Sequence, residues 1–348
     1  MTGDRRSLAG GVRSYWRERT GIGVKDHLRL ASLDLGTNST RLLVAECDGV
    51  RTETVDRRMV ITRLGEGVDG SRYLLPAAVE RTIAAISGFV DVMRPLEPVG
   101  VVAAATSVLR DSRNGQQFID RVEKMLGART RILAGDEEAR LSFLGAVSDL
   151  EAAVRVGEGG AALVFDIGGG STEFVVGEYP MTKKDLTVKS VDVGCVRMTE
   201  RFLTKSDPPS PLAVGRMEAF LVASLKPVTE TLRALKPTLV VGLAGTVTTL
   251  SGIKQNLEEY DTERIHHSRL TRQDVEEMFM RLVTATVARR RDIMGLEPGR
   301  ADIIVGGIAV LRAIMDLTGL DEILVSEKDI LDGLVIDLYN NKRECRNW

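Results

Sequence analysis

LVFDIGGGSTEFVVG, residues 163–177, is the stretch from which the fold and the site can be inferred. Two apolar runs flank three glycines, and they are too short for helices, so they predict a hairpin of two buried strands. We expect the glycines to adopt positive φ and turn successive N–H groups toward an anion, with hydroxyls added by Ser171 and Thr172. Asp166 and Glu173 place carboxylates at the two ends of this turn, which suits Mg²⁺. The alternative is a purely structural turn, which would have no need of those polar side chains.

A second copy of the pattern lies 132 positions earlier, in residues 31–44, ASLDLGTNSTRLLV. The offset aligns Asp34 with Asp166, and it also aligns Gly36 with Gly168, Ser39 with Ser171 and Thr40 with Thr172. Arg41 stands where the second copy has Glu173. Two copies of one hairpin in one chain indicate an internal duplication.

The composition is that of an ordinary globular protein with room for two domains. The chain has 348 residues, of which 43% are hydrophobic and 28% charged, and its net charge is −2. This charge predicts no general affinity for nucleic acid or acidic membranes. The sequence contains no run of 18 apolar residues, so we expect no membrane span. The cysteines are odd in number and far apart, as in a reducing, cytoplasmic protein: Cys47, Cys195 and Cys345. No histidine has metal-ligand spacing with a cysteine, so we do not expect zinc: His27, His266 and His267.

The ends of the chain and its middle suggest the domain limits. Residues 1–29 carry seven basic and three acidic residues, a net charge of +4, without the apolar core of a secretory signal. We interpret them as a disordered basic arm or an over-extended start of translation, with recruitment of an anionic partner as the alternative. Residues 151–160 are charged and rich in small residues, as expected of a crossing between halves. The predicted domains span residues 30–158 and 159–327.

Two further segments follow predicted strands. Residues 99–105 predict a buried strand that runs into Thr106, Ser107 and Arg110, and ligands bind at such carboxyl ends in open α/β sheets. The alternative is a helix cap followed by a surface arginine. Residues 239–243 predict a strand that ends in Gly245 and Thr246 before a helix, which also points N–H groups at an anion.

An acidic helix start and several further elements complete the pattern. Residues 134–140, AGDEEAR, begin a predicted helix, and acidic residues there can simply complement the helix dipole. Helical spacing also predicts helices over residues 76–93, 114–126, 212–235, 271–288 and 328–339, and apolar runs predict strands over residues 190–194 and 322–326.

Together these motifs resemble the exopolyphosphatase/guanosine pentaphosphate phosphohydrolase family over nearly the whole chain, from about residue 30 to residue 339. The DIGGGSTE run is the most specific of them. The resemblance implies an α/β fold of two actin-like/sugar-kinase-like (ribonuclease H-like) domains, with the active site in the cleft between them. It also implies that residues 328–342 return to pack on the first domain. The chain looks like the short form, without the C-terminal His-Asp-type domain of longer members.

The resemblance assigns roles to individual residues. Glu138 would be the general base that activates water for in-line attack on a terminal phosphate, assisted by Mg²⁺ with Mn²⁺ as an alternative. The metal would be held by Asp166, Glu173 and Asp34. Phosphates would be bound by Asn38, Ser39, Thr106, Ser107, Arg110, Gly168, Gly169, Gly170, Ser171, Thr172, Gly245 and Thr246.

The substrate and its class stay open at this level. Inorganic polyphosphate, as short chains, and guanosine pentaphosphate end in the same phosphoanhydride, and no stretch identifies a guanine site. Rival readings are an ATP-driven kinase or filament ATPase, since the same paired domains carry those functions, and a non-catalytic sensor of polyphosphate or guanosine pentaphosphate. A homodimer is common for the family.

Overall fold

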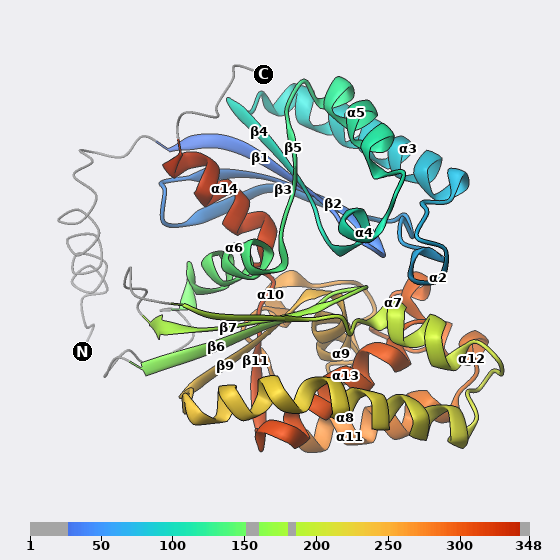
Figure 1. Ribbon diagram of the computed structural model, residues 1–348. Helices are drawn as coiled ribbons and strands as arrows, with labels where there is room; N and C mark the ends of the chain where they lie inside the picture. The colour runs from blue at the N-terminus through green and yellow to red at the C-terminus, as the bar shows by residue number, and fades with distance from the viewer. Residues whose placement is uncertain (1–26, 151–159, 180–185, 342–348) are drawn as a thin grey trace.

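The protein, described here by a computed structural model, forms two lobes, each built on one mixed β-sheet (Figure 1). The structure describes residues 27–150, 160–179 and 186–341. The basic arm up to residue 26, the crossing over 151–159 and Cys345 lie outside the described residues. Within those residues, no helix combines the length and apolar character needed to cross a membrane.

The first lobe contains a five-stranded sheet with the order β3-β2-β1-β4-β5. β1 pairs antiparallel with β2 and parallel with β4, while β2 pairs antiparallel with β3. The strands are β1 (Leu28–Leu35), β2 (Ser39–Cys47), β3 (Thr52–Ile61), β4 (Gly100–Ala105) and β5 (Thr130–Ile132).

The second lobe repeats this order in a six-stranded sheet, β10-β11-β9-β6-β7-β8. If β10 is set aside, the order β11-β9-β6-β7-β8 matches the order β5-β4-β1-β2-β3 of the first lobe, and corresponding neighbours run in the same relative directions. This is the ribonuclease H-like arrangement that we expected. The predicted hairpin and its duplication are therefore confirmed. The strands are β6 (Gly160–Ile167), β7 (Thr172–Tyr179), β8 (Thr187–Val191), β9 (Leu239–Leu243), β10 (Arg269–Thr271) and β11 (Glu322–Val325).

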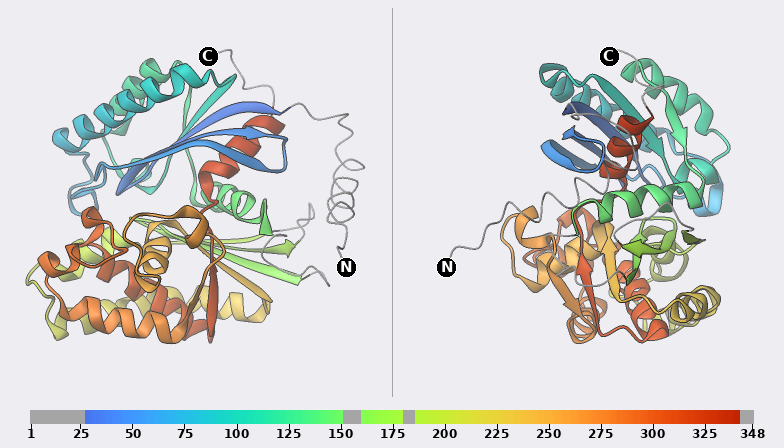
Figure 2. Two further views of the ribbon diagram at one scale, coloured as in Figure 1. Left: turned by 180° about the vertical axis from the view of Figure 1, so that it is seen from behind. Right: turned by 90° about the vertical axis from the view of Figure 1, so that its left-hand side faces the viewer.

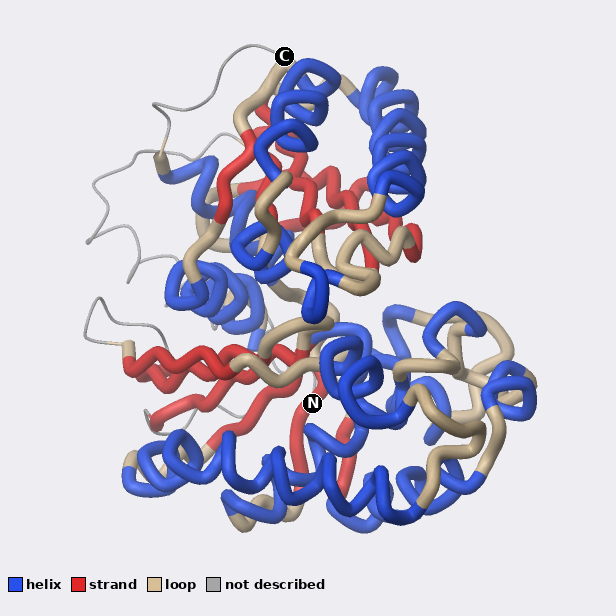
Figure 3. The backbone as a smooth tube through the Cα atoms, turned by 45° about the vertical axis from the view of Figure 1, so that its right-hand side comes forward, coloured by secondary structure: helices blue, strands red, loops and turns tan. Residues whose placement is uncertain are grey.

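Helices cover the outer face of each sheet, and two more helices lie between the sheets (Figures 1, 2 and 3). The first sheet packs against α3 (Pro76–Met93) and α5 (Gly115–Leu126). The second packs against α8 (Pro211–Ala234), α9 (Ala244–Lys254), α11 (Arg272–Thr284) and α13 (Ile304–Thr318). Between them lie α6 (Gly135–Val147) and α14 (Ile330–Asn340).

Short helical turns connect these elements. They are α2 (Val68–Ser71), α4 (Ser107–Asp111), α7 (Cys195–Met198), α10 (Thr262–Ile265) and α12 (Val287–Arg291), with the single turns η1 (Arg94–Leu96), η3 (Thr199–Leu203) and η4 (Pro298–Arg300). In Figure 1, α6 and α14 join the lobes on one side, and α2 approaches α7 on the other.

The crossing of α6 and α14 holds the two lobes together. α6 packs Phe143 against the second sheet and Leu141 against α14, which itself covers the inner face of the first sheet. The two helices approach so closely that a Cβ on Gly145 would overlap the carbonyl oxygen of Asp329, and one on Gly333 would overlap the carbonyl oxygen of Leu141. The first turn of α6, which contains Glu138, is thereby held between the lobes.

Two predicted elements were wrong in their limits. The strand predicted over residues 190–194 is present only in its first two residues, because β8 ends at Val191; Gly194 passes close to the carbonyl of Gly169, where a Cβ would lie 2.5 Å from the oxygen. Residues 271–288 are not one helix. Thr286 is the N-cap of α12, and its side chain accepts the Arg289 N–H, so the helix is interrupted between α11 and α12. The domain limits remain a prediction.

The close contact of α6 and α14 at Gly145 and Gly333 predicts a large loss of stability when either glycine gains a side chain. Gly333→Ala should lower the free energy of unfolding by about 3 kcal/mol or more, because the added methyl group overlaps backbone that cannot move without separating the helices. Gly88→Ala in α3 is the matched control, since a Cβ there has no neighbour within 4 Å. It should stabilise the protein by about 0.5–1 kcal/mol. Urea denaturation of both variants tests this; equal effects would refute the tight crossing.

Candidate active site

The predicted site residues converge on one cavity between the lobes. Its lining includes the turns after β1 and β6, the starts of α4 and α9, and the first turn of α6. The predicted residues that line it are Asp34, Asn38, Ser39, Thr106, Ser107, Glu138, Asp166, Gly168, Gly169, Ser171, Gly245 and Thr246. The lining does not include Arg110, Gly170, Thr172 and Glu173.

The two duplicated turns have the same backbone geometry. The Gly36 N–H donates to the Ser39 carbonyl at 3.1 Å, and 132 positions later the Gly168 N–H donates to the Ser171 carbonyl at 3.0 Å. The expected positive φ was wrong, because none of the glycines at 36, 168, 169 and 170 has one. A Cβ on Gly36 or Gly168 would instead crowd the carbonyl oxygen of Ser39 or Ser171 in its own turn, at 2.9 and 3.1 Å.

The contact between the lobes explains the other two glycines of the triplet, Gly169 and Gly170. A Cβ on Gly169 would lie 2.7 Å from the Thr37 Cβ, and one on Gly170 would lie 2.7 Å from the Ser107 Oγ. Both neighbours belong to the first lobe, so any side chain at these positions would push the lobes apart.

The predicted phosphate ligand Thr172 has a structural contact, because its hydroxyl donates to the Val193 carbonyl at 2.6 Å.

Strand alternation brings the carboxylates to the inner faces of the two sheets. On β6, Val164 packs toward α6, so Asp166 points the same way and accepts a hydrogen bond from Ser142 of α6 at 3.1 Å. Glu173 lies opposite Asp166 on β7 and accepts a bond from Ser190 at 2.9 Å. Both side chains are buried, so their charges interact at short range in a poorly solvated space.

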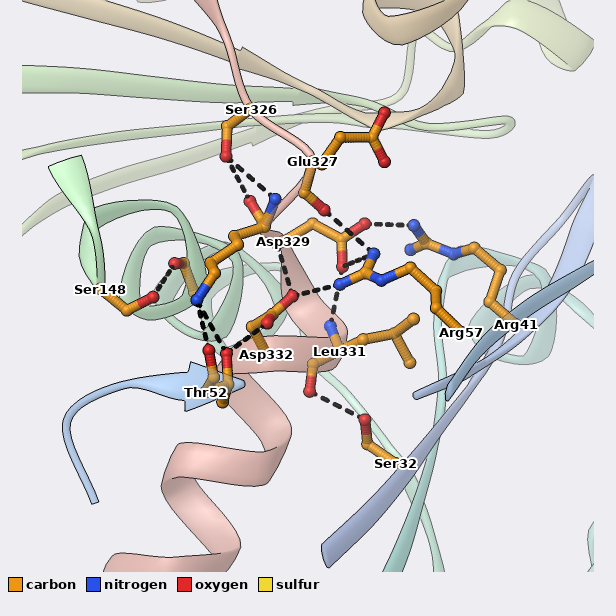
Figure 4. A network of polar contacts seen from close by, with 12 residues as sticks. Ser32, Arg41, Thr52, Arg57, Ser148, Ser326, Glu327, Asp329, Leu331 and Asp332 are labelled. Carbon is orange, nitrogen blue, oxygen red and sulfur yellow. Dashed lines mark hydrogen bonds and ion pairs between the residues drawn. The ribbon is translucent and has the colours of Figure 1, made fainter. Parts of the chain in front are cut away.

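In the first lobe, the same position of the hairpin carries a cation. Arg41 donates to Asp34 Oδ2 from Nε at 2.9 Å and from Nη2 at 2.7 Å, and its Nη1 pairs with Asp329 before α14 (Figure 4). On β3, Arg57 pairs with Asp332 in the first turn of α14. Burial alone would raise the pKa of Asp329, but the two guanidinium groups outweigh burial and lower it. This role of Arg41 was not foreseen, although its exchange for Glu173 in the repeat was a visible signal.

Glu138 is held by a first-lobe arginine. The Arg110 Nη1 donates to Glu138 Oε2 and to the Leu133 carbonyl, both at 2.7 Å. Burial, together with the charges of Asp166 and Asp34, raises the pKa of Glu138 to about 7 despite the opposing charge of Arg110. A carboxyl with a pKa near neutrality can both accept and hold a proton at physiological pH.

The other carboxyls also hold protons more tightly than usual. Burial raises the pKa of Asp166 to about 6, against the charge of Arg41. Burial, together with the charges of Glu138 and Asp166, raises the pKa of Glu173 well above its ordinary value. Burial also raises the pKa of Asp34 in spite of its ion pair with Arg41. The carboxylates therefore crowd the site with too little positive charge to balance them.

The chemistry of this donor set suits a divalent cation, although in the part of the chain that the structure describes the oxygens of Asp34, Asp166 and Glu173 do not all lie within 4.8 Å of one another. Asp34 Oδ1 and Glu173 Oε2 are buried and have no hydrogen-bond partner. The crowded carboxylates offer only oxygen donors, which Mg²⁺ and Mn²⁺ prefer.

Arg300 also lines the cavity and was missed as an individual site residue. Its Nη1 donates to the Gly245 carbonyl at 2.6 Å and to the Thr249 hydroxyl at 2.8 Å. Both partners are neutral, so these hydrogen bonds do not neutralise the positive charge of the guanidinium. That charge is available to an anionic ligand near the start of α9.

A second cluster of potential metal ligands lies where the chain passes between the lobes. Donor atoms of Asp149, His266 and His267 lie within 4.8 Å of one another. His266 Nδ1 accepts the Glu327 N–H at 3.1 Å, so the neutral ring carries its proton on Nε2 and donates it to Asp149 at 3.0 Å. The Lys328 ammonium lies 3.6 Å from the same carboxylate oxygen. A metal ion would compete with the His266 and Lys328 contacts of Asp149. The cluster is therefore better explained as a structural hydrogen-bond and ion-pair network.

A larger cavity of about 410 Å³ adjoins the cleft at Thr37, Asn38 and Ile303. Three cationic and four acidic side chains line it: Arg63, Lys205 and Arg290, and Glu66, Glu200, Asp207 and Asp302. Positive charge therefore does not extend outward from the carboxylate-rich centre.

Comparison with known proteins gives a consistent result. Residues 43–342 match the model of the Ppx/GppA phosphatase family. The chain is 38% identical over 323 residues to exopolyphosphatase 2 of Mycobacterium tuberculosis, covering 89% of this chain and 98% of that protein. It superposes on the crystal structure of an exopolyphosphatase-like protein with a TM-score of 0.82 and 33% identity, covering 90% and 99% of the two chains.

A longer relative matches over part of its length. The guanosine-5'-triphosphate,3'-diphosphate pyrophosphatase of Aeromonas hydrophila is 29% identical over 320 residues, which cover 90% of this chain and 60% of that protein.

The buried ion-pair network predicts a stability effect far larger than that of a surface pair. Arg41→Met should cost about 3–5 kcal/mol of unfolding free energy, because it leaves Asp34 and Asp329 buried without their cation. Arg121→Gln breaks an exposed pair with Glu80 and should have no measurable effect. Guanidinium denaturation at neutral pH compares them, and a mild effect of Arg41→Met would contradict the assigned role.

Proposed function

The chain belongs to the Ppx/GppA phosphatase family, and we propose that it is a phosphoanhydride hydrolase that releases terminal orthophosphate from short inorganic polyphosphate or from guanosine pentaphosphate. The observation that carries the proposal is the convergence of Glu138 with both duplicated turns in one cavity. Hydrolysis of a terminal phosphate needs a water molecule in line with the leaving oxygen and compensation of charge on the phosphate oxygens. Residues from both lobes can provide these two requirements.

Glu138 is the proposed general base. Its carboxylate would accept a proton from the attacking water as the new P–O bond forms and the phosphoanhydride P–O bond breaks. Arg110 fixes the orientation of one of its oxygens and leaves the other for water.

The turns and the arginine of the second lobe would bind the phosphates. Gly168, Gly169 and Ser171 from the second lobe and Asn38 and Ser39 from the first face the same cavity. Arg300 adds a positive charge beside Gly245 and Thr246. Asp166, Glu173 and Asp34 would hold Mg²⁺, which when bound neutralises charge on the phosphate oxygens.

Two substrates are supported by the relatives. Those relatives are named as an exopolyphosphatase and as a guanosine-5'-triphosphate,3'-diphosphate pyrophosphatase. The charges around the larger cavity support short chains, because four acidic side chains against three cations offer a long polyphosphate no basic track. Guanosine pentaphosphate as the main substrate is the alternative, and a non-catalytic sensor would bind both compounds without releasing phosphate.

Replacement of the base tests the chemistry. Glu138→Gln should lower orthophosphate release by about 10²–10⁴-fold while leaving binding of tripolyphosphate nearly intact, because the amide cannot accept the proton. Glu137→Gln is the matched control, since Glu137 pairs with Arg131 and does not line the cavity. Near-normal release by Glu138→Gln in a phosphate assay would remove it as the base.

A substrate and metal panel tests the rest of the proposal. Orthophosphate release from tripolyphosphate, long-chain polyphosphate and guanosine pentaphosphate should require Mg²⁺ and stop with EDTA, because the carboxylates lack balancing charge. Short chains should react faster than long ones. A rate that rises with chain length into the hundreds would contradict the short-chain proposal, and binding without release would support the sensor.

A further inference from the structure

The carbonyl groups of the three glycines in the turn after β6 all accept hydrogen bonds from α7. The Gly168 carbonyl accepts the Cys195 N–H at 3.0 Å, and the Gly169 carbonyl accepts the N–H groups of Val196 and Arg197 at 2.9 and 3.1 Å. The donors are the first N–H groups of α7, which have no partner inside their own helix. A peptide whose carbonyl is held on one side presents its N–H on the other side, so these bonds favour N–H groups toward the cavity.

The third glycine carbonyl has a side chain as its partner. The Arg197 Nε donates to the Gly170 carbonyl at 2.7 Å. This bond completes the set that the backbone of α7 begins. Without it, the Gly170 peptide would be free to rotate its oxygen toward a phosphate, which would repel it.

The rest of the same guanidinium reaches across the cleft. Nη1 pairs with Asp69 of α2, and Nη2 donates to Asp111 of α4 at 2.6 Å. Both carboxylates belong to the first lobe, whereas Arg197 and Gly170 belong to the second. The Arg197 side chain is only 10% exposed, so these charge-assisted bonds form with little competition from water.

We propose that Arg197 is a positioning residue that couples closure of the two lobes to the orientation of the phosphate-binding turn. The inference rests on the proposed function and extends it. When the lobes close, Asp69 and Asp111 orient the planar guanidinium, which then holds the Gly170 carbonyl out of the cavity. The turn thus acquires its anion-binding geometry in the closed state. Lysine cannot replace this function, because one ammonium group cannot donate in three fixed directions.

Kinetics of two variants separate the two halves of this coupling. Arg197→Gln should lower kcat for tripolyphosphate by roughly 10–100-fold, because a small misplacement of the phosphate is enough for such a loss. The double variant Asp69→Asn/Asp111→Asn keeps the Nε donor to Gly170 but loses the two charges that orient the guanidinium, together with the Asp111 pair with Arg72. It should raise KM and lower kcat in the same direction as Arg197→Gln but by less, roughly 3–10-fold, because the bond to Gly170 can still form without a fixed orientation. Arg121→Gln, which breaks an exposed pair, should match the wild-type enzyme.

Binding measured without turnover keeps the test independent of activity. In a Glu138→Gln background, calorimetry with tripolyphosphate and Mg²⁺ should show weaker affinity, by tenfold or more, when Arg197→Gln is added. Circular dichroism and melting temperature should confirm that each variant is folded. If the wild-type enzyme releases no phosphate, the proposed function fails, and this binding comparison still decides the role of Arg197.

Two results would overturn the inference. One is wild-type kcat and affinity in folded Arg197→Gln, which would leave the bond to Gly170 without consequence. The other is wild-type kcat and KM in folded Asp69→Asn/Asp111→Asn, which would mean that the cross-lobe pairs do not orient the guanidinium.

Discussion

The close crossing of α6 and α14 is the constraint on which the rest of the structure depends. Two glycines let the helices touch backbone to backbone, and α6 packs on the second sheet while α14 packs on the first. Since α6 begins beside the cavity, this crossing determines where Glu138 lies. Asp329 is the N-cap of α14, and Arg41 contacts it together with Asp34. A single packing contact therefore sets the position of Glu138, the proposed base, and of a cleft carboxylate.

The duplicated hairpins share a backbone but differ in charge. Asp34 faces Arg41 across β1 and β2, whereas Asp166 faces Glu173 across β6 and β7. The first hairpin is neutralised by its own cation, and the second accumulates negative charge that burial makes costly. The two hairpins therefore differ in their charge. In the first lobe the carboxylate is paired within its own hairpin, whereas in the second lobe two carboxylates face each other without a cation opposite them in the hairpin.

Short-range features of the site followed from residue patterns because their causes are local. Short apolar runs specify the strands of the hairpins, and strand ends followed by Thr106 or Gly245 lie where anion-binding turns occur. The reason for the glycine triplet was misjudged, since Gly169 and Gly170 avoid Thr37 and Ser107 of the other lobe rather than adopt positive φ. A collision between segments distant in sequence has no local signature.

The sequence by itself determined the two hairpins, their duplication and the types of chemical group that they carry. Periodicity and spacing act within a few residues, so they can be read directly from the chain. Only the tertiary structure decided which charges meet: Arg41 and Asp329 lie 288 positions apart, and Arg197 and Asp69 lie 128 apart. Their pairing depends on how α14 returns to the first sheet and how the lobes close. Those are packing outcomes of the whole chain, and they determine which carboxylates are neutralised and which are left for a ligand.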